Sequence, residues 1–106
     1  MASQLTPSNT LFGQRLREAR LRAGIAQDRL GVMIGLDEGS SSARMSRYET
    51  GVHEPPFAIA EQLAKALEVE ACYFYCRDNR LAEFILSYSQ LSEKGRRACD
   101  LKSIFP

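Results

Sequence analysis

The sequence is poor in the residues from which metal sites and disulfide frameworks are built. It has one histidine, His53, and three cysteines among its 106 residues. A structural zinc site needs four nitrogen or sulfur ligands, and an odd number of cysteines cannot pair completely. Cys72 and Cys76 are four residues apart and could share a helix face, but they lack enough partners. We therefore expect free thiols, no metal and no cofactor.

Long apolar runs are also missing. No segment approaches the roughly 18 apolar residues that a membrane-spanning helix requires. The first ten residues are polar and uncharged, without the basic and then apolar order of a secretory signal. We expect a cytoplasmic protein without a membrane segment, in which residues 1–10 form a flexible tail.

The chain has little excess charge of either sign. Its formal net charge is +1, so composition alone does not indicate a nucleic-acid partner, and any such partner must be recognised by locally placed arginines. The sequence also lacks a nucleophile–base arrangement and a phosphate-cradling glycine loop. We therefore expect that the protein is not an enzyme.

The first part of the chain has a strong helical pattern. Asn9 or Thr10 can cap a helix from about Leu11 to Ala23, and Gly24 can end it in the left-handed conformation. Arg15 and Arg17 fall outside the apolar stripe, where a solvated face or contact with a nucleic-acid backbone is expected. The stripe itself consists of Phe12, Leu16, Ala19 and Ala23.

Two short helices separated by a glycine are expected next. The first runs from about Gln27 to Ile34 and is ended by Gly35, and the second runs from Ser40 or Ser41 to Thr50. This is the pattern of a helix-turn-helix. Glycine inside a helix costs ~1 kcal/mol relative to alanine, so Gly31 is best explained by a close crossing of the two helices. Met45 is expected to fill the space between them.

The remainder is also helical in pattern, so the fold class is all-α. Pro55 and Pro56 can begin a fourth helix, a short helix follows near 71–75, and Asp78 or Asn79 opens a sixth. Ser92 can cap a last helix that reaches toward Ile104. No segment alternates convincingly as a strand.

Several stretches in order resemble the phage-repressor and Cro-like family of XRE-type helix-turn-helix regulators. The resemblance covers about residues 11–76. It implies a five-helix, lambda-repressor-like DNA-binding domain, to which residues 77–106 add one or two helices. The matching stretches are Phe12-Gly-Gln-Arg-Leu-Arg-Glu-Ala-Arg20, Gly24-Ile-Ala-Gln-Asp-Arg-Leu30, Gly35-Leu36, Met45-Ser-Arg-Tyr-Glu-Thr-Gly51, Glu54-Pro55 and Leu63-Ala-Lys-Ala-Leu67-Glu-Val69.

The resemblance also implies roles for individual residues. Gln27 corresponds to a glutamine that contacts a phosphate, and Arg20 and Glu49 correspond to a structural ion pair. The helix at about Ser41–Thr50 would lie in the major groove. Its implied DNA contacts are Ser41, Ser42, Ala43, Arg44 and, one turn later, Arg47.

The sequence departs from the family pattern mainly in the turn. Asp37 to Gly51 spans about four residues more than is typical, so an insertion near residues 38–41 is expected. The insertion leaves the start of the third helix open, and it places Asp37 and Glu38 on the DNA side. Ala26 replaces the usual hydroxyl cap before Gln27, and Glu68 stands where a glycine commonly ends the fourth helix.

Residues 77–106 carry an apolar stripe that either folds back on the domain or pairs with a second copy. We favour pairing, because two-fold dimers double the base contacts on palindromic sites. The first functional hypothesis is a homodimeric repressor that binds a palindromic operator in double-stranded DNA at the nucleoid. The alternative is a protein–protein interaction module, a bridging factor or an antitoxin-like partner. The candidate dimer residues are Leu81, Phe84, Ile85, Tyr88 and Leu91.

Overall fold

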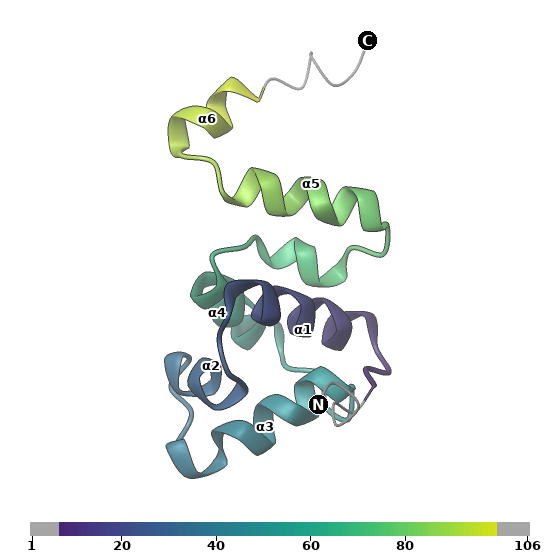
Figure 1. Ribbon diagram of the computed structural model, residues 1–106, viewed down its shortest axis with the longest axis vertical. Coiled ribbons are helices and arrows are strands. Elements are labelled where there is room, and N and C mark those ends of the chain that lie inside the picture. Colours follow the sequence, from purple (N-terminus) through teal and green to yellow (C-terminus); the bar gives the residue numbers. More distant parts are fainter. Residues whose placement is uncertain (1–6, 100–106) are drawn as a thin grey trace.

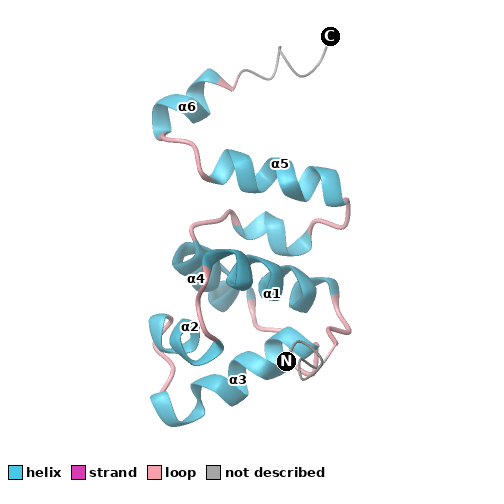
Figure 2. Cartoon of the chain, in the orientation of Figure 1, coloured by secondary structure: helices cyan, strands magenta, loops and turns pink. Residues whose placement is uncertain are grey.

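The computed structural model describes residues 7–99, which form seven helical elements (Figure 1) and no strand within that range. The predicted all-α class is therefore confirmed. Figure 2 shows short loops between the helices. In chain order the elements are α1 (Leu11–Ala23), α2 (Gln27–Met33), α3 (Glu38–Thr50), α4 (Phe57–Leu67), the 3₁₀ helix η2 (Ala71–Tyr75), α5 (Asn79–Ser89) and α6 (Glu93–Ala98).

The ends of α1 are fixed by the residues that the sequence indicates. The Thr10 hydroxyl accepts a hydrogen bond from the Gly13 amide at 3.0 Å, which satisfies one of the unpaired donors of the first turn. Gly24 ends the helix with φ at +72°, a conformation that costs glycine little. Of the expected stripe, only Ala23 is exposed, because it lies at the last position before the turn.

The core lies where α1, α2, α3, α4 and η2 meet. One large side chain from each of these five elements is fully shielded from solvent, and the rings of Phe12 and Phe74 pack with their centroids 5.0 Å apart. Burial of a large apolar side chain contributes about 1.5–3 kcal/mol, so these residues hold α1 against the other helices. The five side chains are Leu16, Leu30, Met45, Leu63 and Phe74.

The N-terminal residues that are described attach to the domain. The Asn9 amide donates to the Thr50 carbonyl oxygen at 3.0 Å, at the end of α3. Part of the expected tail, residues 1–6, lies outside the described residues, but the chain is already fixed at Asn9 and Thr10.

Arg15 differs from the expectation of a solvated face or a DNA-backbone contact. It is only 4% exposed, and its guanidinium group lies 5.7 Å from the centre of the Tyr73 ring. Its Nε donates to the Cys76 carbonyl oxygen at 2.8 Å. Burial, together with the neighbouring Glu18 carboxylate, raises the pKa of the Tyr73 phenol. The arginine therefore belongs to the interior of the fold.

The C-terminal helices lie at the end of the molecule opposite α3 (Figure 1). Asp78 caps α5 by accepting from the Leu81 amide at 3.0 Å, and Ser92 caps α6 by accepting from the Gly95 amide. Within the described residues α6 ends at Ala98, whereas its expected extension toward Ile104 lies outside them. No helix within residues 7–99 is long and apolar enough to cross a membrane.

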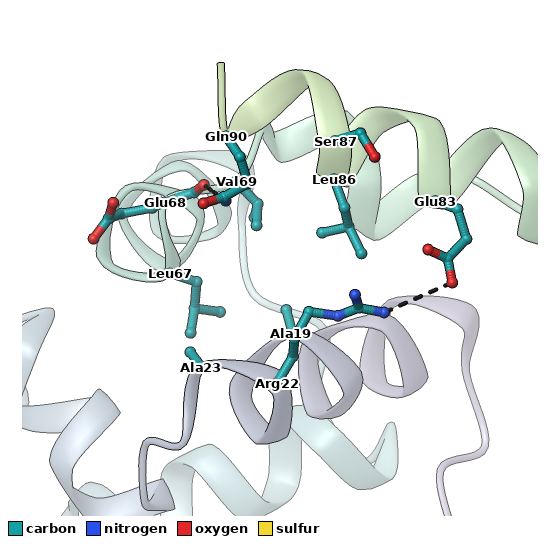
Figure 3. A pocket seen from close by; sticks show the side chains of 10 residues that line it. All are labelled: Ala19, Arg22, Ala23, Leu67, Glu68, Val69, Glu83, Leu86, Ser87 and Gln90. Carbon is teal, nitrogen blue, oxygen red and sulfur yellow. Dashed lines mark hydrogen bonds and ion pairs between the residues drawn. The ribbon is translucent and has the colours of Figure 1, made fainter. Parts of the chain in front are cut away.

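A crevice of about 400 Å³ separates α5 from α1 and the end of α4. Figure 3 shows Leu67 and Leu86 on its walls and the Arg22–Glu83 ion pair on one side, with nitrogen and oxygen 3.7 Å apart. Ala82 and Leu86 are the only fully buried residues of α5. Leu21 stays exposed, so α5 rests on the domain without covering it.

Candidate nucleic-acid interface

The crossing of α2 over α3 is close because Gly31 has no side chain. A Cβ atom added at Gly31 would lie 1.9 Å from the Ser41 Oγ and 3.1 Å from the Met45 Cγ. The Ser41 hydroxyl donates to the Asp28 carbonyl oxygen of α2 at 2.6 Å. Gly31, Ser41 and Met45 thus fix the angle at which α3 leaves α2.

Ser41 is fully buried in this crossing, so the expectation that its side chain contacts DNA is wrong. The physical reason is its register on α3: Ser41 precedes Met45 by four residues, and residues at this spacing share a helix face. The same spacing in the sequence was the available signal for its burial.

The four extra residues do not form a longer turn. They extend α3 by one helical turn, so that α3 begins at Glu38 and Asp37 is the residue before it. The expected start at Ser40 or Ser41 is therefore wrong. The turn between the two helices keeps only residues 34–37, because the inserted residues gain helical hydrogen bonds and the Ser41 hydroxyl ties them to α2.

The outer face of α3 carries the remaining candidate contacts. Ser42, Ala43, Arg44 and Arg47 are all exposed. Arg44 and Arg47 are three residues apart, and neither forms an ion pair with an acidic side chain between residues 7 and 99. Their guanidinium groups thus retain donors for another molecule.

Gln27 begins α2 and is half-buried. Its Nε2 donates to the Glu49 Oε1 at 3.1 Å. A primary amide has two N–H groups, so one remains after this bond. Ala26 gives α2 no side-chain cap, which leaves the start of this helix more open to an outside acceptor.

Glu49 lies at the centre of a network that joins three helices. Its carboxylate is fully buried and accepts from Arg17 Nε at 3.2 Å, from Arg20 Nη2 at 3.2 Å and from Gln27. A closer contact joins Arg20 Nε to the second carboxylate oxygen. Arg20 also donates to the Ile25 carbonyl oxygen at 2.9 Å.

The structure thus brings Arg20 and Glu49 together as the resemblance implies, and it adds Arg17. Arg17 lies three residues before Arg20 on α1, so the two side chains reach the same acceptor from one helix face. The i, i+3 spacing of these arginines was the signal for its part in the network.

The face around α3 is not strongly basic. Asp28, Asp37 and Glu38 are exposed near the start of α3 or on α2. They lie toward one end of α3, whereas Arg44 and Arg47 lie further along it. The arrangement can therefore discriminate between orientations of a charged partner in addition to attracting it.

The apolar residues proposed for dimerisation lie on α5 and just after it. Leu81 is 52% exposed and Phe84 is 50% exposed. Ile85 and Tyr88 are half-buried, and Leu91 is exposed. Ala82 and Leu86 turn toward the domain, and Ile85 also packs against the buried core. The face that remains more open consists of Leu81, Phe84 and Tyr88 on α5 and Leu91 just after it, and we call it the α5 flank.

Known proteins share both the sequence pattern and this arrangement of helices. A family model described as a helix-turn-helix domain matches residues 11–72. The chain is 35% identical over 63 residues to an uncharacterized HTH-type transcriptional regulator, y4wC, of Sinorhizobium fredii (strain NBRC 101917 / NGR234). The match covers 59% of this chain and 41% of that protein, so the chain spans about two fifths of the relative's length.

A solved structure is similar over most of the chain. The crystal structure of the transcriptional regulator BswR superimposes with a TM-score of 0.77 at 43% sequence identity, covering 87% of this chain and 89% of that one. The likeness therefore includes helices beyond the part that the family model matches.

Proposed function

Because the chain belongs to the XRE-like helix-turn-helix family, we propose that it is a transcription regulator that binds double-stranded DNA through the outer face of α3. The observation that carries this proposal is the combination of Arg44 and Arg47 on one exposed helix face with a buried network beneath it. Rigid support of this kind suits a surface that must fit a fixed groove.

Arg44 is the proposed base reader. It lies within the part of α3 that would enter the major groove, next to Ser42 and Ala43. An arginine can donate two hydrogen bonds to guanine O6 and N7, which is worth ~1–3 kcal/mol of discrimination. Arg47, one turn later, is the second proposed contact.

Gln27 is the proposed phosphate contact. Glu49 holds one N–H of its amide, and the second N–H is the donor that a phosphate oxygen can accept. Phosphate contacts fix the orientation of a protein on the duplex without reading sequence. Gln27 would thus set the register from which Arg44 reads bases.

The α5 flank is the proposed seam of a homodimer. Its exposed apolar side chains, Leu81 and Phe84 foremost, would be removed from water when two copies pair. Two copies related by two-fold symmetry would read a palindromic operator with half-sites about one helical turn apart. Such a dimer would act at the nucleoid in the cytoplasm, as a repressor wherever its operator overlaps a promoter.

Selection of bound duplexes from a random pool, with sedimentation of the selected complex, tests the proposal. We expect a palindromic consensus bound by two copies, with affinity that falls steeply as salt rises because phosphate contacts release counterions. Absence of any preferred duplex, together with binding that ignores salt, would instead favour the protein–protein interaction module.

Arg44→Ala should weaken binding to the selected operator about 10-fold to 100-fold while changing nonspecific binding much less. The reason is that the side chain would contact base edges and not only phosphates. The measurement is a titration of both duplexes at one salt concentration, with Arg80→Ala on the exposed start of α5 as the matched control. Equal losses on both duplexes would make Arg44 a phosphate contact.

Gln27→Ala should weaken binding to all duplexes by a similar factor. The loss of one phosphate contact removes affinity but no sequence information. The measurement is a repeat of the random-pool selection with the variant, which should return the same consensus sequence as the wild type. A changed consensus would assign Gln27 to base recognition.

A further inference from the structure

The two C-terminal helices are joined to the domain through a small number of interactions. Only Ala82 and Leu86 of α5 are buried, and Leu86 lines the crevice shown in Figure 3. At the far end, Gln90 Nε2 donates to the Glu68 carbonyl oxygen at 3.3 Å and the Ser89 hydroxyl accepts from the Glu70 amide at 3.1 Å. These end contacts are exposed or only part-buried.

The near end of α5 is held by a buried arginine. Arg15 of α1 donates through Nη2 to the Arg77 carbonyl oxygen at 3.2 Å and to the Asn79 Oδ1 at 3.0 Å. Its Nε donates to the Cys76 carbonyl oxygen, and its Nη1 donates to the Glu18 carboxylate at 3.1 Å. Four of the five guanidinium N–H groups therefore have acceptors. Three of these acceptors lie in the segment that leads from η2 into α5.

From this geometry we infer that Arg15 is the positioning residue that sets the orientation of α5 relative to α1. In a dimer formed through the α5 flank, it therefore sets the separation of the two DNA-binding faces. The inference rests on the proposed function, because the separation of the two DNA-binding faces matters only if two copies of the chain bind one duplex.

Arginine suits this role because its donors form a rigid planar fork. The fork meets two backbone carbonyl groups of the segment before α5 and the Asn79 side chain at the first residue of α5. A change in the direction of α5 at this end therefore strains bonds to a charged donor. Being only 4% exposed, Arg15 leaves water little access to replace those bonds.

The same helix transmits the orientation to the proposed DNA-binding face. Arg17 and Arg20, two and five residues after Arg15 on α1, bind Glu49 of α3. Hydrogen-bonded and packed side chains thus connect α5 to α1 and α1 to α3. DNA rises about 3.4 Å per base pair. A displacement of a few ångströms between the two copies of α3 therefore changes the number of base pairs between half-sites that the dimer binds best.

The test measures binding of the full chain to duplexes that carry two copies of the selected half-site, with their separation varied one base pair at a time. The wild-type chain should prefer one spacing. In Arg15→Lys, whose ammonium cannot span three acceptors, the preference for that spacing over its neighbours should fall about tenfold. Affinity for a single half-site should stay within about twofold, since α3 is unchanged.

Asn79→Ala supplies an independent variant if Arg15→Lys fails to fold. It removes one acceptor on exposed α5 and should reduce the spacing preference in the same direction but less, whereas Arg80→Ala should leave it intact. Full wild-type spacing preference in a folded Arg15→Lys would overturn the inference, as would full preference in Asn79→Ala if Arg15→Lys does not fold. A wild-type chain that binds as one copy without any spacing preference would instead overturn the dimer itself.

Discussion

Glu49→Ala is expected to lower the free energy of unfolding by about 3–5 kcal/mol. The substitution removes the only acceptor that Arg17, Arg20 and Gln27 share, and it leaves positive charge in a site that is shielded from solvent. Since a domain of this kind is stable by only about 5–15 kcal/mol, this loss is a large fraction of its total stability. Denaturant unfolding followed by helical circular dichroism measures the loss.

Two further variants identify the cause of that loss. Glu61→Ala, on the exposed face of α4, should change stability by less than about 0.5 kcal/mol. Glu49→Gln keeps the size of the side chain but not its charge, so it should fall between wild type and Glu49→Ala. If Glu49→Ala unfolds at the same denaturant concentration as Glu61→Ala, the network does not stabilise the fold.

Gly13→Ala is expected to destabilise the protein by about 3 kcal/mol, at the upper end of the usual cost of overpacking. A Cβ atom at this position would lie 2.3 Å from the Glu49 carbonyl oxygen and 2.9 Å from the Tyr48 carbonyl oxygen. Both are backbone atoms, so α1 as a whole must move away from α3. Alanine's better helix propensity, worth ~1 kcal/mol, does not offset this displacement. Thermal and denaturant unfolding of both proteins measure this change in the free energy of unfolding.

Gly39→Ala is the matched control for this substitution. Gly39 also lies inside a helix, but an added Cβ would meet nothing closer than an Asp37 oxygen at 3.9 Å. The control should therefore leave stability unchanged or raise it slightly. A Gly13→Ala protein as stable as Gly39→Ala would show that α1 and α3 are not closely packed.

Local signals in the sequence predicted most helix boundaries. Thr10, Asp78 and Ser92 each accept a hydrogen bond from the backbone amide three residues later, and Gly24 and Gly51 end helices in the left-handed conformation. These interactions join residues within one turn, so a single sequence contains both partners. The close crossing at Gly31 was also predicted correctly, although its packing partners Ser41 and Met45 are not local, because a glycine inside a helix needs a packing explanation.

The unpredicted features depend on residues far apart in the chain. Arg15 contacts a carbonyl group 61 positions later, and no local pattern shows that partner. Among the candidate DNA contacts, Ser41 was assigned from family correspondence, although its spacing from Met45 indicated burial. The start of α3 was missed because an insertion was expected to lengthen a loop, whereas residues 38–41 form another turn of helix that the Ser41 hydroxyl ties to α2.

The division of α3 into two faces has a consequence for how such proteins diverge. Its buried residues, Ser41, Met45, Tyr48 and Glu49, maintain the architecture, whereas Ser42, Ala43, Arg44 and Arg47 take no part in it. Natural drift or a designed library can therefore rewrite the outward-facing set without loss of folding. Under the proposed function, substitutions at these four surface positions would change which DNA sequence is bound while the fold is kept.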